Sequence, residues 1–344
     1  MRCLLNPALN AAAVPAPSGD AAAFHASLPR YRATPVRTLP ELAAELGVAT
    51  VALKDESDRL GLPAFKVLGA AWAVERTLRE HPGIDTLVAA SAGNHGRAVA
   101  HVAAQRALRC RIFLPQRSAA ARRDAIAAEG AEIVIVDGSY EDAVAQAAAA
   151  GGERGSVEIA DVGGSGPARW VIDGYATLFA EAAEQHDHDM ILVPVGVGSL
   201  AAAGARYASR AGAQLIGVEP VTAACLTASL AAGRPTRVPT PGSTMAGLDC
   251  AEVSTAAWPS LRDGVHATVT VDDEETRAAM RELAAKGLAI GESGAAPLAA
   301  LRALAADPRC STLRRSLPLA PESRILLIAT EGPTDPASFR EALA

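Results

Sequence analysis

The sequence predicts an α/β protein with two lobes, each a largely parallel, twisted sheet covered by helices. Short apolar runs rich in β-branched residues alternate with long Ala-rich helical segments, as in parallel sheets with helices on both faces. Half of the 344 residues are hydrophobic, enough to form cores in two domains. Nine strand-like runs also exceed one small sheet. We therefore expect a cleft for ligands at the carboxyl ends of the strands.

The elements follow from these periodicities in chain order. Short apolar runs rich in β-branched residues predict strands at Val51–Leu53, Thr86–Ala90, Arg111–Leu114, Glu132–Val136, Val157–Ile159, Ile191–Val195, Leu215–Val218, Ala267–Val271 and Arg324–Ile328. Longer Ala-rich stretches with charged faces predict helices at Leu68–Glu80, Arg97–Gln105, Arg122–Glu129, Glu141–Ala150 and Leu200–Ser209. The segment Met1–Ala23 lacks the apolar core of a signal peptide, so we expect a loosely ordered arm or a first short helix.

Composition excludes several classes of protein. The chain is mildly acidic, with a formal net charge of -6, and it lacks clustered cations interleaved with aromatic residues. We therefore expect no nucleic-acid partner. No apolar run is long enough to span a bilayer, so we expect no membrane association.

The five cysteines form no CxxC pair and no metal-ligand spacing. This argues against a disulfide scaffold or a zinc ribbon and favours a reducing cytoplasm. His186–Asp189 is interpreted as a solvated turn rather than a metal cluster, and we expect no metal site.

Lys66 is one of only three lysines. It stands at the start of an apolar helix, directly after Phe65, where a partly desolvated amine can form a Schiff base. The alternative interpretation is an ordinary solvated lysine in a first helical turn.

A glycine-rich turn, Gly196-Val-Gly-Ser199, leads from a strand into the helix that begins near Leu200. Its backbone N–H groups at a helix N-terminus suit a phosphate. The alternatives are a turn without a ligand, or a dinucleotide-binding motif with Glu219 as the ribose-binding acid.

A second loop, Ala90–Gly96, also joins a strand to a helix. Ser91 and Asn94 offer neutral hydrogen-bonding groups, and Gly93 opens the backbone, so a carboxylate would fit there. On the residues alone, His95 is interpreted as packing against the sheet.

Together these motifs resemble the fold type II pyridoxal-phosphate enzymes, and more closely the diaminopropionate ammonia-lyases. The resemblance runs from about Pro29 to the C-terminus. The motifs that carry it are KDES from Lys54, GLPAFKVLGA from Gly61, GNHGR from Gly93, DGYAT from Asp173, TMAGL from Thr244, GESG from Gly291 and TEGPTDP from Thr330.

The resemblance implies pyridoxal 5'-phosphate as cofactor, a small amino-acid substrate and a homodimer. Lys66 would hold the cofactor, with Phe65 packing near it. The other cofactor-binding residues would be Asn94, Gly196, Val197, Gly198, Ser199, Leu200 and Thr330. The substrate carboxylate would be received by Ser91, Gly93 and His95. Residues 1–65 and 170–344 would form the large cofactor-binding domain, and residues 66–169 the smaller domain with the carboxylate loop.

Asp161 matches an aspartate that the ammonia-lyases place near the substrate's amino group. Ala92 departs from the family, in which an aspartate precedes the glycine of this loop, and so one acid-base carboxylate is missing. Cys225 and Cys250 match a pair that can occur near the active-site mouth in the family, and we expect both as thiols.

The implied function is α,β-elimination of 2,3-diaminopropionate to pyruvate and two ammonia, with Lys66 and Asp161 as catalytic residues. The alternative enzyme is a serine or threonine dehydratase. The alternative of another class is a protein that binds the cofactor or an amino acid without turnover.

Overall fold

The computed structural model describes residues 2–116, 118–164 and 166–344. Internal contacts divide the chain into two compact units. Unit 1 contains residues 1–18, 32–65 and 176–344, and unit 2 contains residues 19–31 and 66–175.

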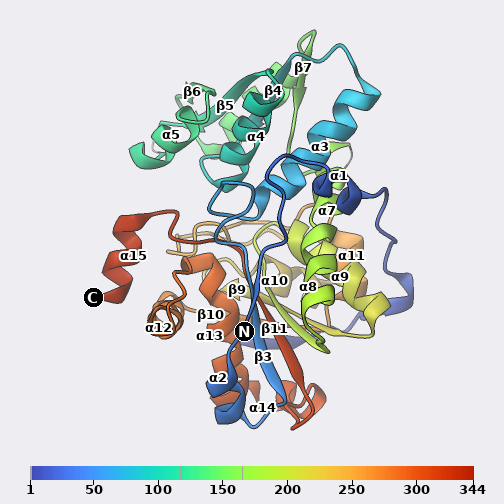
Figure 1. Cartoon of the computed structure of the whole chain (residues 1–344), viewed down its shortest axis with the longest axis vertical. Coiled ribbons are helices and arrows are strands. Elements are labelled where there is room, and N and C mark those ends of the chain that lie inside the picture. Colours follow the sequence, from blue (N-terminus) through green and yellow to red (C-terminus); the bar gives the residue numbers. More distant parts are fainter. Residues whose placement is uncertain (1, 117, 165) are drawn as a thin grey trace. The chain divides into compact units, whose positions relative to one another are not determined.

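Unit 1 is built on a seven-stranded sheet of order β1-β10-β9-β8-β11-β3-β2. The inner strands are parallel, and the edge strands β1 and β2 are antiparallel to their neighbours. Figure 1 shows β3 and β11 side by side, although they come from opposite ends of the chain. The strands are β1 (Cys3–Leu5), β2 (Val36–Thr38), β3 (Thr50–Asp55), β8 (Met190–Pro194), β9 (Gln214–Pro220), β10 (Ala267–Val271) and β11 (Arg324–Ala329).

Helices cover this sheet and bury its apolar side chains. Helix α13 is almost wholly buried and belongs to one large hydrophobic core with strands β3, β8, β10 and β11. The α-helices of unit 1 are α2 (Pro40–Leu46), α8 (Ala176–Gln185), α9 (Ser199–Ala211), α10 (Cys225–Ala232), α11 (Trp258–Gly264), α12 (Asp273–Ala285), α13 (Glu292–Ala306), α14 (Ser311–Ser316) and α15 (Pro336–Leu343). Two short 3-10 helices are η1 (Ala11–Ala13) and η2 (Pro308–Cys310).

Unit 2 is built on a four-stranded, fully parallel sheet of order β6-β5-β4-β7. Its strands are β4 (Thr86–Ala90), β5 (Arg109–Pro115), β6 (Glu132–Val136) and β7 (Ser156–Glu158). Its helices are α1 (Ala21–Ala26), α3 (Lys66–Glu80), α4 (Asn94–Gln105), α5 (Ala120–Ala127), α6 (Tyr140–Gly151) and α7 (Pro167–Gly174). Helix α3 packs tightly on α7, because a side-chain carbon at Gly69 would lie 2.6 Å from the ring of Tyr175.

All nine strands expected from the sequence are present, and so are the five expected helices. The expectation for the N-terminus is wrong in part. The described residues after Met1 begin with strand β1, which pairs with β10 from Cys3 opposite Val269 to Leu5 opposite Ala267. A three-residue edge strand of this kind has no periodicity of its own and forms because a partner strand is available.

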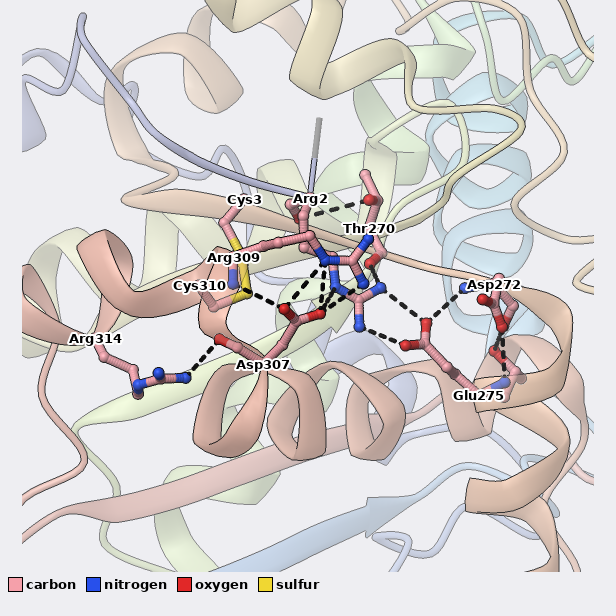
Figure 2. Close-up of polar contacts among 10 residues, drawn as sticks. Arg2, Cys3, Thr270, Asp272, Glu275, Asp307, Arg309, Cys310 and Arg314 are labelled. Atoms are coloured by element: carbon pink, nitrogen blue, oxygen red, sulfur yellow. Dashed lines mark hydrogen bonds and ion pairs between the residues drawn. A yellow bond between two sulfur atoms is a disulfide. The ribbon is translucent and has the colours of Figure 1, made fainter.

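The expectation that the cysteines form no disulfide is also wrong for one pair. Cys3 and Cys310 are bonded across a sequence separation of 307 residues, whereas Cys225 and Cys250 are not in a disulfide and are thiols, as expected. Figure 2 shows Arg2 beside this bond, with ion pairs to Glu275 at 2.6 Å and to Asp307 at 3.2 Å. The N-terminal strand is therefore attached covalently and electrostatically to the C-terminal part of unit 1.

Candidate active site

The glycine-rich turn joins β8 to α9 in unit 1. Gly198 is the N-cap of α9 with φ of 91°, a left-handed conformation that favours glycine. As a glycine, this N-cap residue has no side chain with which to cap the helix. A side-chain carbon at Gly196 would come within 2.5 Å of the Gly247 carbonyl oxygen, so only glycine fits there. The turn therefore presents backbone at the positive end of a helix dipole, as an anion site requires.

Phe65 and Thr330 also lie close together in unit 1. Thr330 directly follows β11, and its carbonyl accepts a hydrogen bond from the Phe65 N–H at 3.2 Å. Ala64 and Glu331 continue this contact as an isolated antiparallel bridge. The segment that ends in Phe65 is thus fixed to the end of the last strand, and both side chains are buried.

A buried ionic cluster supports that segment. It consists of Lys54, Glu56, Arg59 and Glu181, and every member lies in unit 1. Arg59 Nη2 donates to Glu56 Oε1 at 2.6 Å, and Arg59 Nη1 to Glu181 Oε1 at 2.6 Å. Burial works against ionisation, but Arg59 and Lys54 lower the pKa of Glu181 to about 2. Sequence reasoning missed this cluster, although charged residues ending an apolar strand were a signal for it.

In unit 2, Lys66 is the first residue of α3 and forms an ion pair with Asp161. Lys66 Nζ lies 2.8 Å from Asp161 Oδ2, and the two side chains are only 19% and 15% exposed. Burial opposes the charge of Asp161, but His95, Lys66 and the Lys66 hydrogen bond together hold the pKa of this carboxyl below its usual range. Asp161 is therefore an ionised, mostly buried carboxylate that binds an amine.

The loop after β4 brings its residues to the same part of unit 2. Ser91 Oγ accepts from the Gly93 N–H at 3.3 Å, and α4 begins at Asn94. A side-chain carbon at Gly96 would lie 2.2 Å from the Ser91 carbonyl oxygen, so the tight turn requires glycine. His95 is buried, with Nε2 2.7 Å from the Ile159 carbonyl oxygen and Nδ1 3.9 Å from Asp161 Oδ2.

The structure thus brings Lys66, His95 and Asp161 together in one unit. It also adds Tyr175, a fully buried phenol that interacts electrostatically with Lys66 and Asp161. Burial raises the pKa of Tyr175, so it stays neutral. The sequence motif Asp173-Gly-Tyr175 is part of the family resemblance, but it predicts no role for this tyrosine.

A family model described as "Pyridoxal-phosphate dependent enzyme" matches residues 28–331. The chain belongs to this family. Its cofactor is pyridoxal phosphate, as the sequence predicted. The observed residues fit this group, because the Gly196–Gly198 turn at the start of α9 suits its phosphate and Lys66 offers a mostly buried amine.

Individual relatives extend the comparison. The chain is 34% identical to a diaminopropionate ammonia-lyase of Escherichia coli strain K12, over 93% of this chain and 89% of that protein. It is 30% identical to a biosynthetic L-threonine dehydratase of the same organism, over 78% of this chain and 52% of that protein. The predicted resemblance to the diaminopropionate ammonia-lyases is therefore confirmed.

Solved structures give the same result for the fold. The Escherichia coli diaminopropionate ammonia-lyase, in complex with an aminoacrylate-PLP azomethine reaction intermediate, matches with a TM-score of 0.90. The sequences are 32% identical, and the match covers 99% of this chain and 96% of that one. The predicted α/β fold type II class is confirmed. Among the described residues, no helix is both long and apolar enough to cross a membrane.

Proposed function

We propose that this pyridoxal-phosphate-dependent lyase acts on 2,3-diaminopropionate, which it converts with one water to pyruvate and two ammonia. The observation that carries this proposal is the ionised Asp161 carboxylate, which binds an amine at 2.8 Å. A carboxylate in that position selects a leaving group that is basic and can be cationic. The β-amino group of diaminopropionate meets this requirement, and the hydroxyl of serine or threonine does not.

Each binding residue has a proposed task. Gly196, Val197, Gly198, Ser199 and Leu200 bind the cofactor phosphate with backbone N–H groups and the α9 dipole. Asn94 and Phe65 would contact the bound cofactor, and the hydroxyl of Thr330 would face its ring nitrogen. Ser91, Gly93 and His95 lie on the loop that receives the substrate carboxylate.

The bound cofactor supplies an electron sink for the negative charge that develops at the substrate's Cα. The chain's own residues then move protons. Lys66, as a neutral amine, takes the Cα proton and becomes an ammonium. Asp161 holds the β-amino group by a charge-assisted hydrogen bond and lies where that group needs a proton to leave. We assign proton abstraction from the opposite face of the substrate to Asp161 as well.

A serine or threonine dehydratase is the second candidate, because L-threonine dehydratases are among the relatives. Its substrate loses a hydroxyl group, for which an anionic Asp161 is a poor partner. Asp161→Asn separates the two candidates. If this variant loses at least 100-fold in kcat on diaminopropionate, the result supports the lyase. If the wild type and the variant turn over serine equally well, the result supports the dehydratase.

The decisive experiment supplies the cofactor-loaded enzyme with L- and D-diaminopropionate, L-serine and L-threonine, and measures keto acid and ammonia together. Two ammonia per pyruvate from diaminopropionate, at a higher kcat/KM than on serine or threonine, support the proposal. Turnover of serine or threonine without turnover of diaminopropionate refutes it. Lys66→Ala is expected to abolish turnover. Asp124→Asn on exposed helix α5 is the matched control and is expected to keep full activity.

The domain roles, the oligomeric state and the location of the protein belong to the same proposal. Residues 1–65 and 170–344 carry the phosphate turn, and residues 66–169 carry the carboxylate loop.

A solution mass of twice the chain mass by light scattering supports a homodimer, and a single chain mass refutes it. We place the protein in the cytoplasm, where cellular thiols would reduce the Cys3–Cys310 bond, so we expect alkylation of the denatured protein from freshly lysed cells to label all five cysteines. The Cys3–Cys310 bond would instead leave three.

A further inference from the structure

The hydrogen bonds of His95 define which of its nitrogens carries a proton. Nε2 lies 2.7 Å from the carbonyl oxygen of Ile159. A carbonyl oxygen can only accept, so Nε2 must be the donor and carry the proton. In the neutral ring, Nδ1 therefore has a lone pair and no proton.

That lone pair is buried without a hydrogen-bond partner among the described residues. The atom that it approaches is Asp161 Oδ2, at 3.9 Å, which is itself an acceptor. Two buried acceptors that face each other are unfavourable, and an unpartnered buried nitrogen in a native structure calls for an explanation. One additional proton would satisfy Nδ1 and would give Asp161 Oδ2, which already accepts from Lys66 Nζ, a second donor.

The surrounding charges determine when that proton can bind. Burial lowers the pKa of His95, the Asp161 carboxylate opposes this effect, and the Lys66 ammonium adds to it. Tyr175 is the other titratable group of this cluster, and it is a buried neutral phenol. While Lys66 is a cation, it compensates the negative charge of Asp161, and His95 stays a neutral imidazole. When Lys66 loses its charge, Asp161 loses the cation that lies 2.8 Å away, and the balance shifts towards protonated His95.

We propose that His95 is a positioning residue that stores on Nδ1 the proton that Asp161 delivers. As Lys66 becomes a neutral amine, an Nζ–H bond breaks and the proton passes through Asp161 Oδ2 to His95 Nδ1. Asp161 stays anionic, and the total charge is unchanged. The delivery half of the cycle rests on the proposed function: Lys66 regains a proton from the substrate's Cα, and the stored proton leaves with the β-amino group as ammonia.

The storage half can be tested without any substrate. The seven histidines are labelled with ¹⁵N in the full-length chain without added cofactor, and the His95 signals are assigned by their loss in His95→Gln. We expect a neutral Nε2–H tautomer near pH 7. In Lys66→Met, we expect the proton affinity of His95 to rise at least tenfold. An Nδ1–H tautomer in the wild type, or an unchanged affinity in Lys66→Met, would overturn the proposal.

The delivery half is tested by two matched variants on α4. Glutamine places its amide nitrogen where Nε2 lies, so His95→Gln keeps the donor to Ile159 and removes the Nδ1 acceptor. We expect kcat on diaminopropionate to fall at least tenfold, one ionisation to vanish from its pH profile, and the melting temperature to stay within about 2 °C. His101→Gln, a partly exposed control, is expected to behave like wild type.

Wild-type kcat and pH profile in His95→Gln would mean that His95 is only structural, and the proposal would fail. If the wild-type enzyme does not turn over diaminopropionate at all, the proposed function fails instead. The NMR titration then still decides whether His95 stores the proton.

Discussion

The buried ionic cluster in unit 1 allows one effect to be worked out in detail. Arg59 has no exposed side-chain surface, and its guanidinium bridges Glu56 and Glu181. Arg59→Met keeps most of the side-chain volume and removes the charge. Among the members of the cluster, Lys54, which lies 2.8 Å from Glu181, is then the remaining cation for two buried carboxylates.

Breaking a buried ion pair by removing one partner costs about 3–5 kcal/mol, because the remaining charge is left uncompensated. At about 3 °C per kcal/mol for a unit of this size, the melting temperature falls by about 10 °C or more. Calorimetry on the cofactor-free chain at pH 7 measures this change directly. Arg32→Ala is the control, since Arg32 pairs with Asp58 on the surface and we expect a shift below about 2 °C.

The pH dependence gives a second check on the same cluster. The folded protein holds the pKa of Glu181 at about 2, below its ordinary value of 4.5. The stabilisation that follows from this lowered pKa is complete above about pH 4.5 and is lost as the pH falls towards 2. The difference between wild type and Arg59→Met should shrink over this range. A melting temperature for Arg59→Met within 3 °C of wild type at pH 7 would refute the reasoning.

Three further predictions follow from particular contacts. Gly198→Ala, strained at φ of 91°, should weaken cofactor binding at least tenfold in an absorbance titration; an unchanged affinity would mean that the turn binds no phosphate. Gly96→Ala would place its side chain 2.2 Å from the Ser91 carbonyl oxygen, and should raise KM for the amino acid at least fivefold. Cys3→Ser removes the disulfide to Cys310 and should lower the free energy of unfolding by about 4 kcal/mol, measured in urea under oxidising conditions. Equal free energies of unfolding for the wild type and the variant would contradict a formed disulfide.

Much of the fold could be predicted from the sequence, because it depends on local patterns. The run Ile191–Val195 has the composition of a buried parallel strand, and the glycines that follow it predict a turn into a helix. Lys66 was expected to open a helix, and it is the first residue of α3. The family resemblance then connected motifs that local patterns could not connect.

The contacts that define the chemistry were not predictable in this way. His95 and Asp161 are far apart in sequence, and their approach depends on β4 and β7 being neighbours in one sheet. The tautomer of His95 depends on the single backbone carbonyl of Ile159. Cys3 and Cys310 are separated by almost the whole chain, so their spacing contains no signal of a bond.

Strand β1 has a practical consequence for handling the protein. It covers one side of β10, which would otherwise be an exposed edge of the large sheet with unpaired backbone groups. Such edges recruit strands from other molecules and start aggregation. An affinity tag or a truncation that displaces residues 3–5 would therefore reduce the yield of dispersed protein, and a tag after helix α15 leaves the protective strand in place.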